Sequence, residues 1–298
     1  WIRSVKVRTL KGTFMNKVTI VTDSMSGIGR EEAQSLGIYV LPMPFYIEDE
    51  CYYEGISLSR EAFFEAQESG KDVTTSQPAP TAVMEIWDRA LENSETLVYI
   101  PMTSGLSGSC ATAMTLACDE AYEGRVFVVD NGRIATPMHQ CILDACGMAE
   151  AGKSAQEIKD ILESERENCL VYLALDTLEY LKKGGRISNS AALVGGLLKI
   201  KPITKIELGL LEPYKKCRGF SKAKADMIAA MKEAVEGRFK EAYDSGNLYI
   251  MASGSSDEEA TKAWIAQIEE AFPGMDIRYD PLGLSICCHT GPGTLGIG

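Results

Sequence analysis

The chain has 298 residues, of which 45% are hydrophobic, and its formal net charge is −12. This length allows one large or two medium domains, and the composition is that of a globular protein. The negative charge disfavours nucleic acid as a partner, because a polyanion is repelled by the average field. The longest nearly continuous apolar run covers residues 38–47. A membrane-spanning helix needs about 20 apolar residues, so no stable membrane insertion is expected.

Nine cysteines are scattered without a CxxC pair or the spacing of a metal site. Such a set indicates reduced thiols and a cytoplasmic location rather than a disulfide framework, and no metal or other cofactor is expected. Residues 1–14 are basic but lack the apolar core of a signal peptide. We interpret them as a poorly ordered extension ahead of Met15, where a strand pattern begins.

Strands and helices are expected to alternate through the first half of the chain. A buried strand at residues 18–22 opens the series, and an extended stretch at 38–47 follows it. The next elements are helices at 59–67 and 80–91, a strand at 97–100, a helix at 109–121, a strand at 126–129 and a helix at 134–150. This alternation is typical of an α/β fold, in which helices cover both faces of a sheet.

The second half continues the pattern. Ser154, followed three residues later by Glu157, predicts a capping box that opens a helix ending near Asn168. The remaining elements are strands at 170–175, 248–252 and 276–279, a hairpin of 199–206 with 210–215 closed near Gly209, and helices at 177–183, 221–238 and 257–272. We predict two domains, residues 15–160 and 161–298, which pack tightly because no low-complexity linker separates them.

Four loops are rich in glycine or small hydroxyl residues. They are TTSQPAP at 74–80, TSGLSGS at 103–109, LKKGGRIS at 181–188 and CHTGPGTLGIG at 288–298. The first two precede predicted helices, whose first amides and dipole favour an anion. Thr75, Ser104 and Ser107 are the candidate hydroxyl donors. A single serine or threonine before a helix is usually a cap, but two such loops together favour an anion site.

Basic side chains that could complete this site are few. Arg186 follows two glycines, and Arg218 precedes another. The guanidinium group offers a fork of donors that suits carboxylate and phosphate. His289 could donate to a carboxylate as well. The structural alternatives are a surface salt bridge for each arginine and a hydrogen-bonded structural role for His289, and His139 is interpreted as structural.

The sequence lacks several sharper enzyme templates. It has no GxxxxGK[ST] phosphate loop, no complete GxGxxG after the first strand and no HExxH. The frame around Ser107 resembles a nucleophile elbow only loosely, because the second glycine is replaced by Ser109. Cys287 and Cys288 are expected to be buried structural thiols. These features favour a binding protein without catalytic residues; the alternatives are a serine hydrolase or acyltransferase using Ser107 and His289, and a sensor domain for another small anion.

Six motifs occur in order between Met15 and Gly298. They are TDS at 22–24, TSQP at 75–78, TSGLSGS at 103–109, LEYLKKGGRIS at 178–188, LLKIKPI at 197–203 and HTGPGTLGIG at 289–298. Together they resemble the DegV family, the bacterial fatty-acid-binding proteins that present acyl chains to a fatty acid kinase.

The resemblance implies a two-domain α/β protein of the DegV-like (EDD) fold, with a long-chain fatty acid between the domains. By motif matching, Thr75 and either Ser107 or Ser104 would hold the carboxylate, and His289 would complete that network. Arg186 and Arg218 would lie at the mouth of the site or contact the kinase. The implied role is that of a non-catalytic carrier, with the fatty acid as its ligand and the kinase subunit as its partner.

Overall fold

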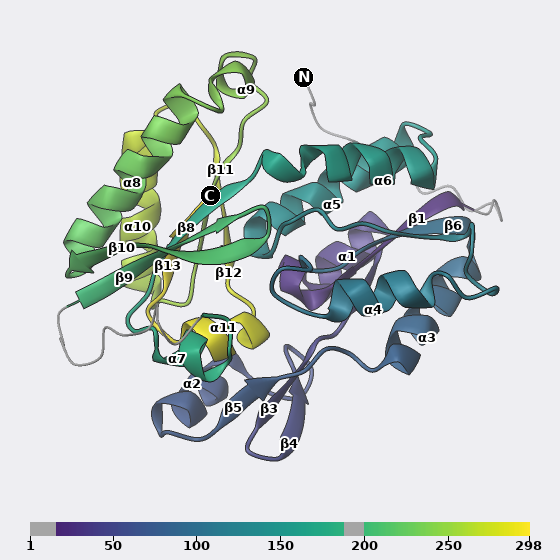
Figure 1. The fold of residues 1–298 in the computed structure, drawn as a ribbon, viewed down its shortest axis with the longest axis horizontal. Coiled ribbons are helices and arrows are strands. Elements are labelled where there is room, and N and C mark those ends of the chain that lie inside the picture. The colour runs from purple at the N-terminus through teal and green to yellow at the C-terminus, as the bar shows by residue number, and fades with distance from the viewer. Residues whose placement is uncertain (1–15, 188–199) are drawn as a thin grey trace.

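The computed structural model describes residues 16–187 and 200–298, and within them three β-sheets organise the fold (Figure 1). The expectation for residues 1–14 lies outside these ranges. So do position 188 and positions 197–199, which belong to two of the motifs.

A four-stranded parallel sheet belongs to the first half of the chain. Its order is β2 (Tyr39–Leu41), β1 (Asn16–Asp23), β6 (Ser94–Ile100) and β7 (Val126–Val128). The chain leaves β1 toward β2 on one side and returns to β6 on the other. The carboxyl ends of β1 and β6 therefore form a topological switch point, where open α/β sheets place their ligand crevice.

A six-stranded mixed sheet belongs to the second half. Its order is β10 (Leu210–Arg218), β9 (Ile200–Glu207), β8 (Leu170–Ala174), β13 (Leu295–Ile297), β11 (Ile250–Gly254) and β12 (Ile277–Pro281). The turn between β9 and β10 has φ of 53° at Leu208 and 79° at Gly209. Positive φ at both central residues is the geometry of a tight hairpin turn, which explains the glycine.

A small antiparallel sheet joins the two halves. It consists of β4 (Glu50–Tyr53), β3 (Pro44–Ile47) and β5 (Val73–Thr75). Helices α2 (Arg60–Glu68) and α11 (Leu284–Thr290) pack against it, and Phe45, Phe63 and Leu284 share one buried cluster. A helix from the end of the sequence thus packs on a sheet from its beginning.

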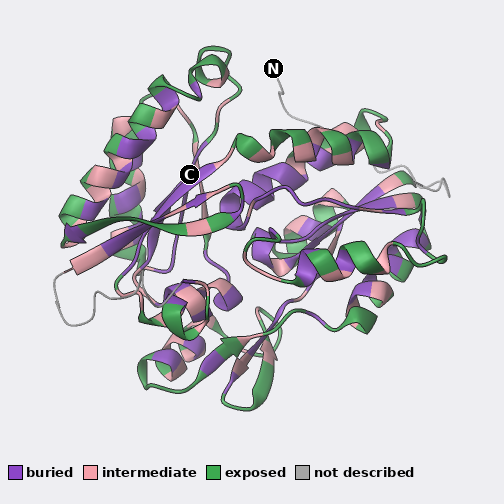
Figure 2. Cartoon of the chain, in the orientation of Figure 1, coloured by how far each residue is buried: buried purple, intermediate pink, exposed green. Residues whose placement is uncertain are grey.

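The other helices are α1 (Arg30–Leu36), α3 (Pro80–Leu91), α4 (Ser109–Leu116), α5 (Ala135–Glu150), α6 (Ala155–Ser164), α7 (Glu179–Lys183), α8 (Phe220–Glu236), α9 (Lys240–Asp244) and α10 (Glu258–Ala271), with short 3-10 turns at Ser24–Ser26 and Glu165–Glu167. Most of them cover the faces of the two larger sheets, whereas α7 packs against α11 (Figure 1). Helix α5 lies between the sheets, since Val98 of β6, Ile142 of α5 and Leu173 of β8 belong to one cluster. The strands on both sides of it are largely buried (Figure 2).

The structure confirms the predicted α/β class and corrects the bounds of several predicted helices and strands. The extended stretch at 38–47 is divided between β2 and β3, which belong to different sheets on either side of Pro42. The helix expected at 109–121 ends at Leu116, and the helix expected to end near Asn168 ends at Ser164 before a 3-10 turn.

The predicted division into residues 15–160 and 161–298 stays a prediction. Position 160 lies within α6, and the change from the four-stranded to the six-stranded sheet comes after that helix.

Candidate functional site

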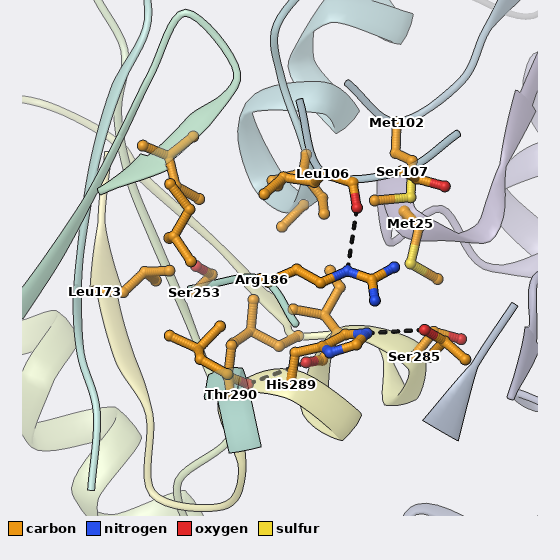
Figure 3. Close-up of a pocket in the computed structure, with 18 of the residues that line it drawn as sticks. Met25, Met102, Leu106, Ser107, Leu173, Arg186, Ser253, Ser285, His289 and Thr290 are labelled. Carbon is orange, nitrogen blue, oxygen red and sulfur yellow. Dashed lines mark hydrogen bonds between the residues drawn. The ribbon is translucent and has the colours of Figure 1, made fainter. Parts of the chain in front are cut away.

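A largely apolar cavity lies between the carboxyl ends of the four-stranded sheet and one face of the six-stranded sheet (Figure 3). Its empty space, which includes the opening to solvent, is about 910 Å³. The apolar lining residues are Met25, Met43, Pro44, Met102, Leu106, Ile134, Ala135, Pro137, Val171, Leu173, Leu175, Leu181, Ile206, Leu211, Leu282 and Ile286. The polar ones include four predicted site residues, Thr75, Ser107, Arg186 and His289.

Thr75 and His289 form the centre of the polar part. Thr75 ends β5 and pairs with Phe45 of β3, whereas His289 lies in the last turn of α11. Packing of α11 against the small sheet brings the Thr75 hydroxyl to 2.8 Å from Nε2 of His289. If Nε2 carries the ring proton, the imidazole donates to Thr75, and the hydroxyl proton is free for a ligand oxygen.

His289 is held in its neutral form. Burial lowers the pKa of this imidazole to about 4, and the nearby positive charge of Arg186 acts in the same direction. Its Nδ1 atom is buried and has no hydrogen-bond partner among the described residues. This atom faces Gly184, where a Cβ atom would lie only 2.0 Å from Nδ1. Glycine is therefore required beside the ring.

Arg186 supplies positive charge at the cavity. The chain turns through Gly185, at φ 70°, after α7, and the guanidinium donates to the Gly184 carbonyl at 2.5 Å and to the Leu106 carbonyl at 3.4 Å. No carboxylate of residues 16–187 or 200–298 lies within 4.0 Å of it. Arg186 is half-buried, and within these ranges its guanidinium group bonds only to carbonyl oxygens. Its positive charge therefore remains available to an anionic ligand.

Of the two candidate serines, the structure brings only Ser107 to the cavity. The Ser107 hydroxyl lies 2.8 Å from that of Ser109. Ser104 is exposed, and its hydroxyl donates to Asp130 at 2.5 Å. Asp130 in turn pairs with Arg166 at 2.8 Å. This network fixes the loop, so Ser104 has a structural partner away from the cavity.

Arg218 is also separate from the cavity lining. It is exposed at the end of β10 and pairs with Ile200, four residues before the lining residue Thr204 in β9. At about 3.3 Å per residue, this places Arg218 about 13 Å farther along the strand.

The arrangement lacks the geometry of the alternative hydrolase. Ser107 bonds to Ser109, whereas His289 bonds to Thr75, and in the described residues no carboxylate orients the His289 ring. Burial raises the pKa of the Cys287 thiol to about 12 and raises that of Cys288 as well. Thiols of this kind are inert rather than nucleophilic.

Asp23 is a supporting residue that the sequence reasoning did not single out, although it lies in the TDS motif. Its carboxylate accepts the Met25 amide at 2.9 Å and the Met102 amide at 2.8 Å. Both methionines line the cavity. Asp23 therefore joins the ends of β1 and β6 at the switch point and fixes one wall of the site.

The comparisons with known proteins agree with this architecture. The family model described as "Uncharacterised protein, DegV family" matches residues 17–298. The chain belongs to the DegV family. A DegV domain-containing protein of Streptomyces coelicolor is 32% identical over 94% of this chain and 97% of its own length.

Solved DegV structures share the fold. A DegV family protein from Thermus thermophilus, described as fatty acid binding, superposes with a TM-score of 0.81 at 30% identity, over 94% of this chain and 98% of its own. DegV of Bacillus subtilis, described as a fatty acid binding protein, gives a TM-score of 0.79 at 25% identity, over 94% and 98%. These matches confirm the predicted DegV-like fold.

The described residues contain neither a membrane-spanning helix nor a cluster of metal ligands. Within residues 16–187 and 200–298, no helix is long and apolar enough to cross a membrane. The same ranges contain no cluster of three or more His, Cys, Asp or Glu side chains arranged to hold a metal ion.

Proposed function

We propose that this DegV family member binds a long-chain fatty acid in the cavity, with the carboxylate at Thr75, Ser107, Arg186 and His289. The observation that carries the proposal is a mainly apolar lining with a polar cluster in which Arg186 has no carboxylate partner among the described residues. The fatty acid binding described for the Thermus thermophilus protein supports it.

The chemistry of the cluster suits a carboxylate. The Thr75 and Ser107 hydroxyls donate hydrogen bonds, and the guanidinium of Arg186 balances the charge. Neutral His289 orients the Thr75 hydroxyl without adding a second charge. Each methylene of the tail that is buried contributes about 0.8 kcal/mol, so the apolar walls supply most of the affinity.

The test begins with solvent extraction and mass spectrometry of the purified protein, in which a fatty acid is expected. Thr75→Val and Ser107→Ala should then each weaken binding of a fluorescent fatty acid by about 10- to 100-fold, since a lost hydrogen bond to a charged group costs about 1.5–3 kcal/mol. Ser104→Ala is the matched control from the same loop and should leave the affinity unchanged. Wild-type affinity in both Thr75→Val and Ser107→Ala would refute the assignment.

We further propose that the protein is a non-catalytic carrier that presents its fatty acid to a fatty acid kinase subunit in the cytoplasm. The family resemblance motivates this role. Two arginines are assigned to it: Arg186 at the cavity and Arg218 on the exposed end of β10. Arg218 would contact the kinase without touching the ligand.

This role predicts a separation of binding from turnover. Arg218→Ala should keep the wild-type affinity for fatty acid but lower acyl-phosphate formation by a cognate kinase at limiting carrier. Arg186→Ala should lower both. Normal acyl-phosphate formation with both variants would contradict the roles assigned to the two arginines, whereas no acyl-phosphate formation with the wild type would contradict the kinase role and leave fatty acid binding intact.

A further inference from the structure

The cavity contains buried polar atoms that its own residues do not satisfy. Seven buried side-chain nitrogen or oxygen atoms of the described residues have no hydrogen-bond partner, and three of them belong to cavity-lining residues: Thr204 Oγ1, Ser285 Oγ and His289 Nδ1. Unpaired buried polar groups are uncommon, and each one needs a physical reason. His289 Nδ1 faces Gly184, so the hydroxyls of Thr204 and Ser285 are the two unpaired groups that a ligand of the cavity could satisfy.

Ser285 and His289 belong to the carboxylate end. They lie four residues apart in α11, so both side chains project from the same face of that helix. Thr204 is different because it lies in β9, on the sheet that forms the opposite wall.

Thr204 is fully buried in this sheet wall, at 0% exposure. It pairs with Leu173 of β8, and directly opposed residues project to the same face of a sheet. Leu173 and Ser107 lie on opposite sides of the cavity, with Arg186 between them (Figure 3). Thr204 therefore faces the part of the cavity that the acyl tail would occupy.

The wall around Thr204 is mainly hydrocarbon. The neighbouring wall is built from Val171, Leu173, Ile206 and Leu211. Valine has the shape of threonine without the hydroxyl, and it would leave no polar atom unpaired. A threonine at this position is unfavourable beside a purely hydrocarbon tail, but becomes favourable if the tail carries a group that can hydrogen-bond.

We propose that the preferred ligand is a long-chain fatty acid with an oxygen in the middle of its chain, a hydroxyl or keto group that hydrogen-bonds to Thr204 Oγ1. This inference rests on the proposed function and narrows it to a class of oxygenated fatty acids. Ser253 contributes a second hydroxyl to the same wall, because Leu173 pairs with Gly296 and Gly296 pairs with Ser253 across the sheet.

Competition binding with a series of chain-matched ligands tests the proposal. The series comprises stearic acid, hydroxystearic acids whose hydroxyl moves stepwise through the middle of the chain, and α-hydroxystearic acid, whose hydroxyl adjoins the carboxylate. One mid-chain isomer should bind about tenfold more tightly than stearic acid, the effect of one net hydrogen bond. The α-hydroxy acid should show no such gain.

Two substitutions at Thr204 assign this gain to the hydroxyl. Thr204→Val should lose the tenfold preference and bind stearic acid at least as tightly as the wild type, whereas Thr204→Ser should retain the preference. Thr19→Val is the matched control, a buried strand threonine that does not line the cavity, and should leave both affinities unchanged.

The outcomes separate this inference from the proposed function. Stearic acid binding at least as tightly as every hydroxylated isomer would overturn the inference alone, as would an unchanged preference in Thr204→Val. Failure of the wild type to bind any of these acids would overturn the proposed function, and this inference with it.

Discussion

Gly184 and His289 contact each other in the polar part of the cavity, and this contact explains the first of the two glycines before Arg186. The imidazole lies where a side chain at position 184 would otherwise stand, since a Cβ atom there would be 2.0 Å from Nδ1. The ring is thus fixed between the backbone of Gly184 and the hydroxyl of Thr75. A larger side chain at position 184 would therefore displace His289 and so alter the polar part of the cavity.

We predict that Gly184→Ala displaces His289 from Thr75 and weakens fatty acid binding by about tenfold, the effect of one lost hydrogen bond. Competition with a fluorescent fatty acid measures the change. Gly147→Ala is the control, because nothing lies within 4 Å of the added Cβ and the residue is in α5. Equal affinities of Gly184→Ala and the wild type would show that the ring position does not matter.

Elements with strong local signals could be predicted from the sequence. Helix α3 has the predicted bounds, and the capping box of Ser154 and Glu157 is confirmed, with both reciprocal bonds present. The hairpin closes at Gly209 as expected. Each of these signals depends on residues a few positions apart, so the sequence alone contains the cause.

Elements that are stabilised by partners distant in the sequence could not be predicted. Helix α11 has seven residues, begins after Gly283 and contains Ile, Cys and Thr, which are weak helix formers. It is stabilised by packing on the small sheet. Strand β13 has three residues and a central glycine, and it is recognisable only from its pairing with β8 and β11.

Prediction of the site was limited in the same way, because its contacts join residues that are far apart in the sequence. The hydroxyl loops, Arg186 and His289 were predicted as ligand contacts, and those roles stay predictions. The structure adds that Thr75 contacts His289 across 214 positions of sequence. It also separates Ser107 from Ser104, because only a three-dimensional arrangement reveals that Asp130 bonds to Ser104. Thr204 had no sequence signal, since a threonine in a strand is unremarkable until its neighbours are known.

At the scale of the whole molecule, two buried groups give the folding free energy opposite dependences on pH. Burial raises the pKa of Asp23 from 3.8 to about 6, although the Met102 and Met25 amides act in the other direction. Burial lowers the pKa of His289 from 6.5 to about 4. The stability that Asp23 contributes is present below pH 3.8 and is lost as the pH rises through about 6. The stability that His289 contributes is present above pH 6.5 and is lost as the pH falls through about 4.

Urea unfolding of the wild type, Asp23→Asn and His289→Gln between pH 4 and 7 checks this prediction. The free energy of unfolding of the wild type relative to His289→Gln should fall as the solution is acidified. Relative to Asp23→Asn, it should instead fall as the solution is made more alkaline. Parallel curves for all three proteins would contradict the assigned pKa shifts.

The position of β13 and α11 in the sequence has a consequence for how the protein acquires its ligand during synthesis. The four-stranded sheet is complete once β7 has left the ribosome, so it can form early. The six-stranded sheet cannot, because β8 and β11 lack the strand between them until residues 295–297 emerge. The helix that carries His289 emerges only shortly before. A nascent chain therefore has no closed cavity before β13 emerges, and the proposed fatty acid can be loaded only after that point.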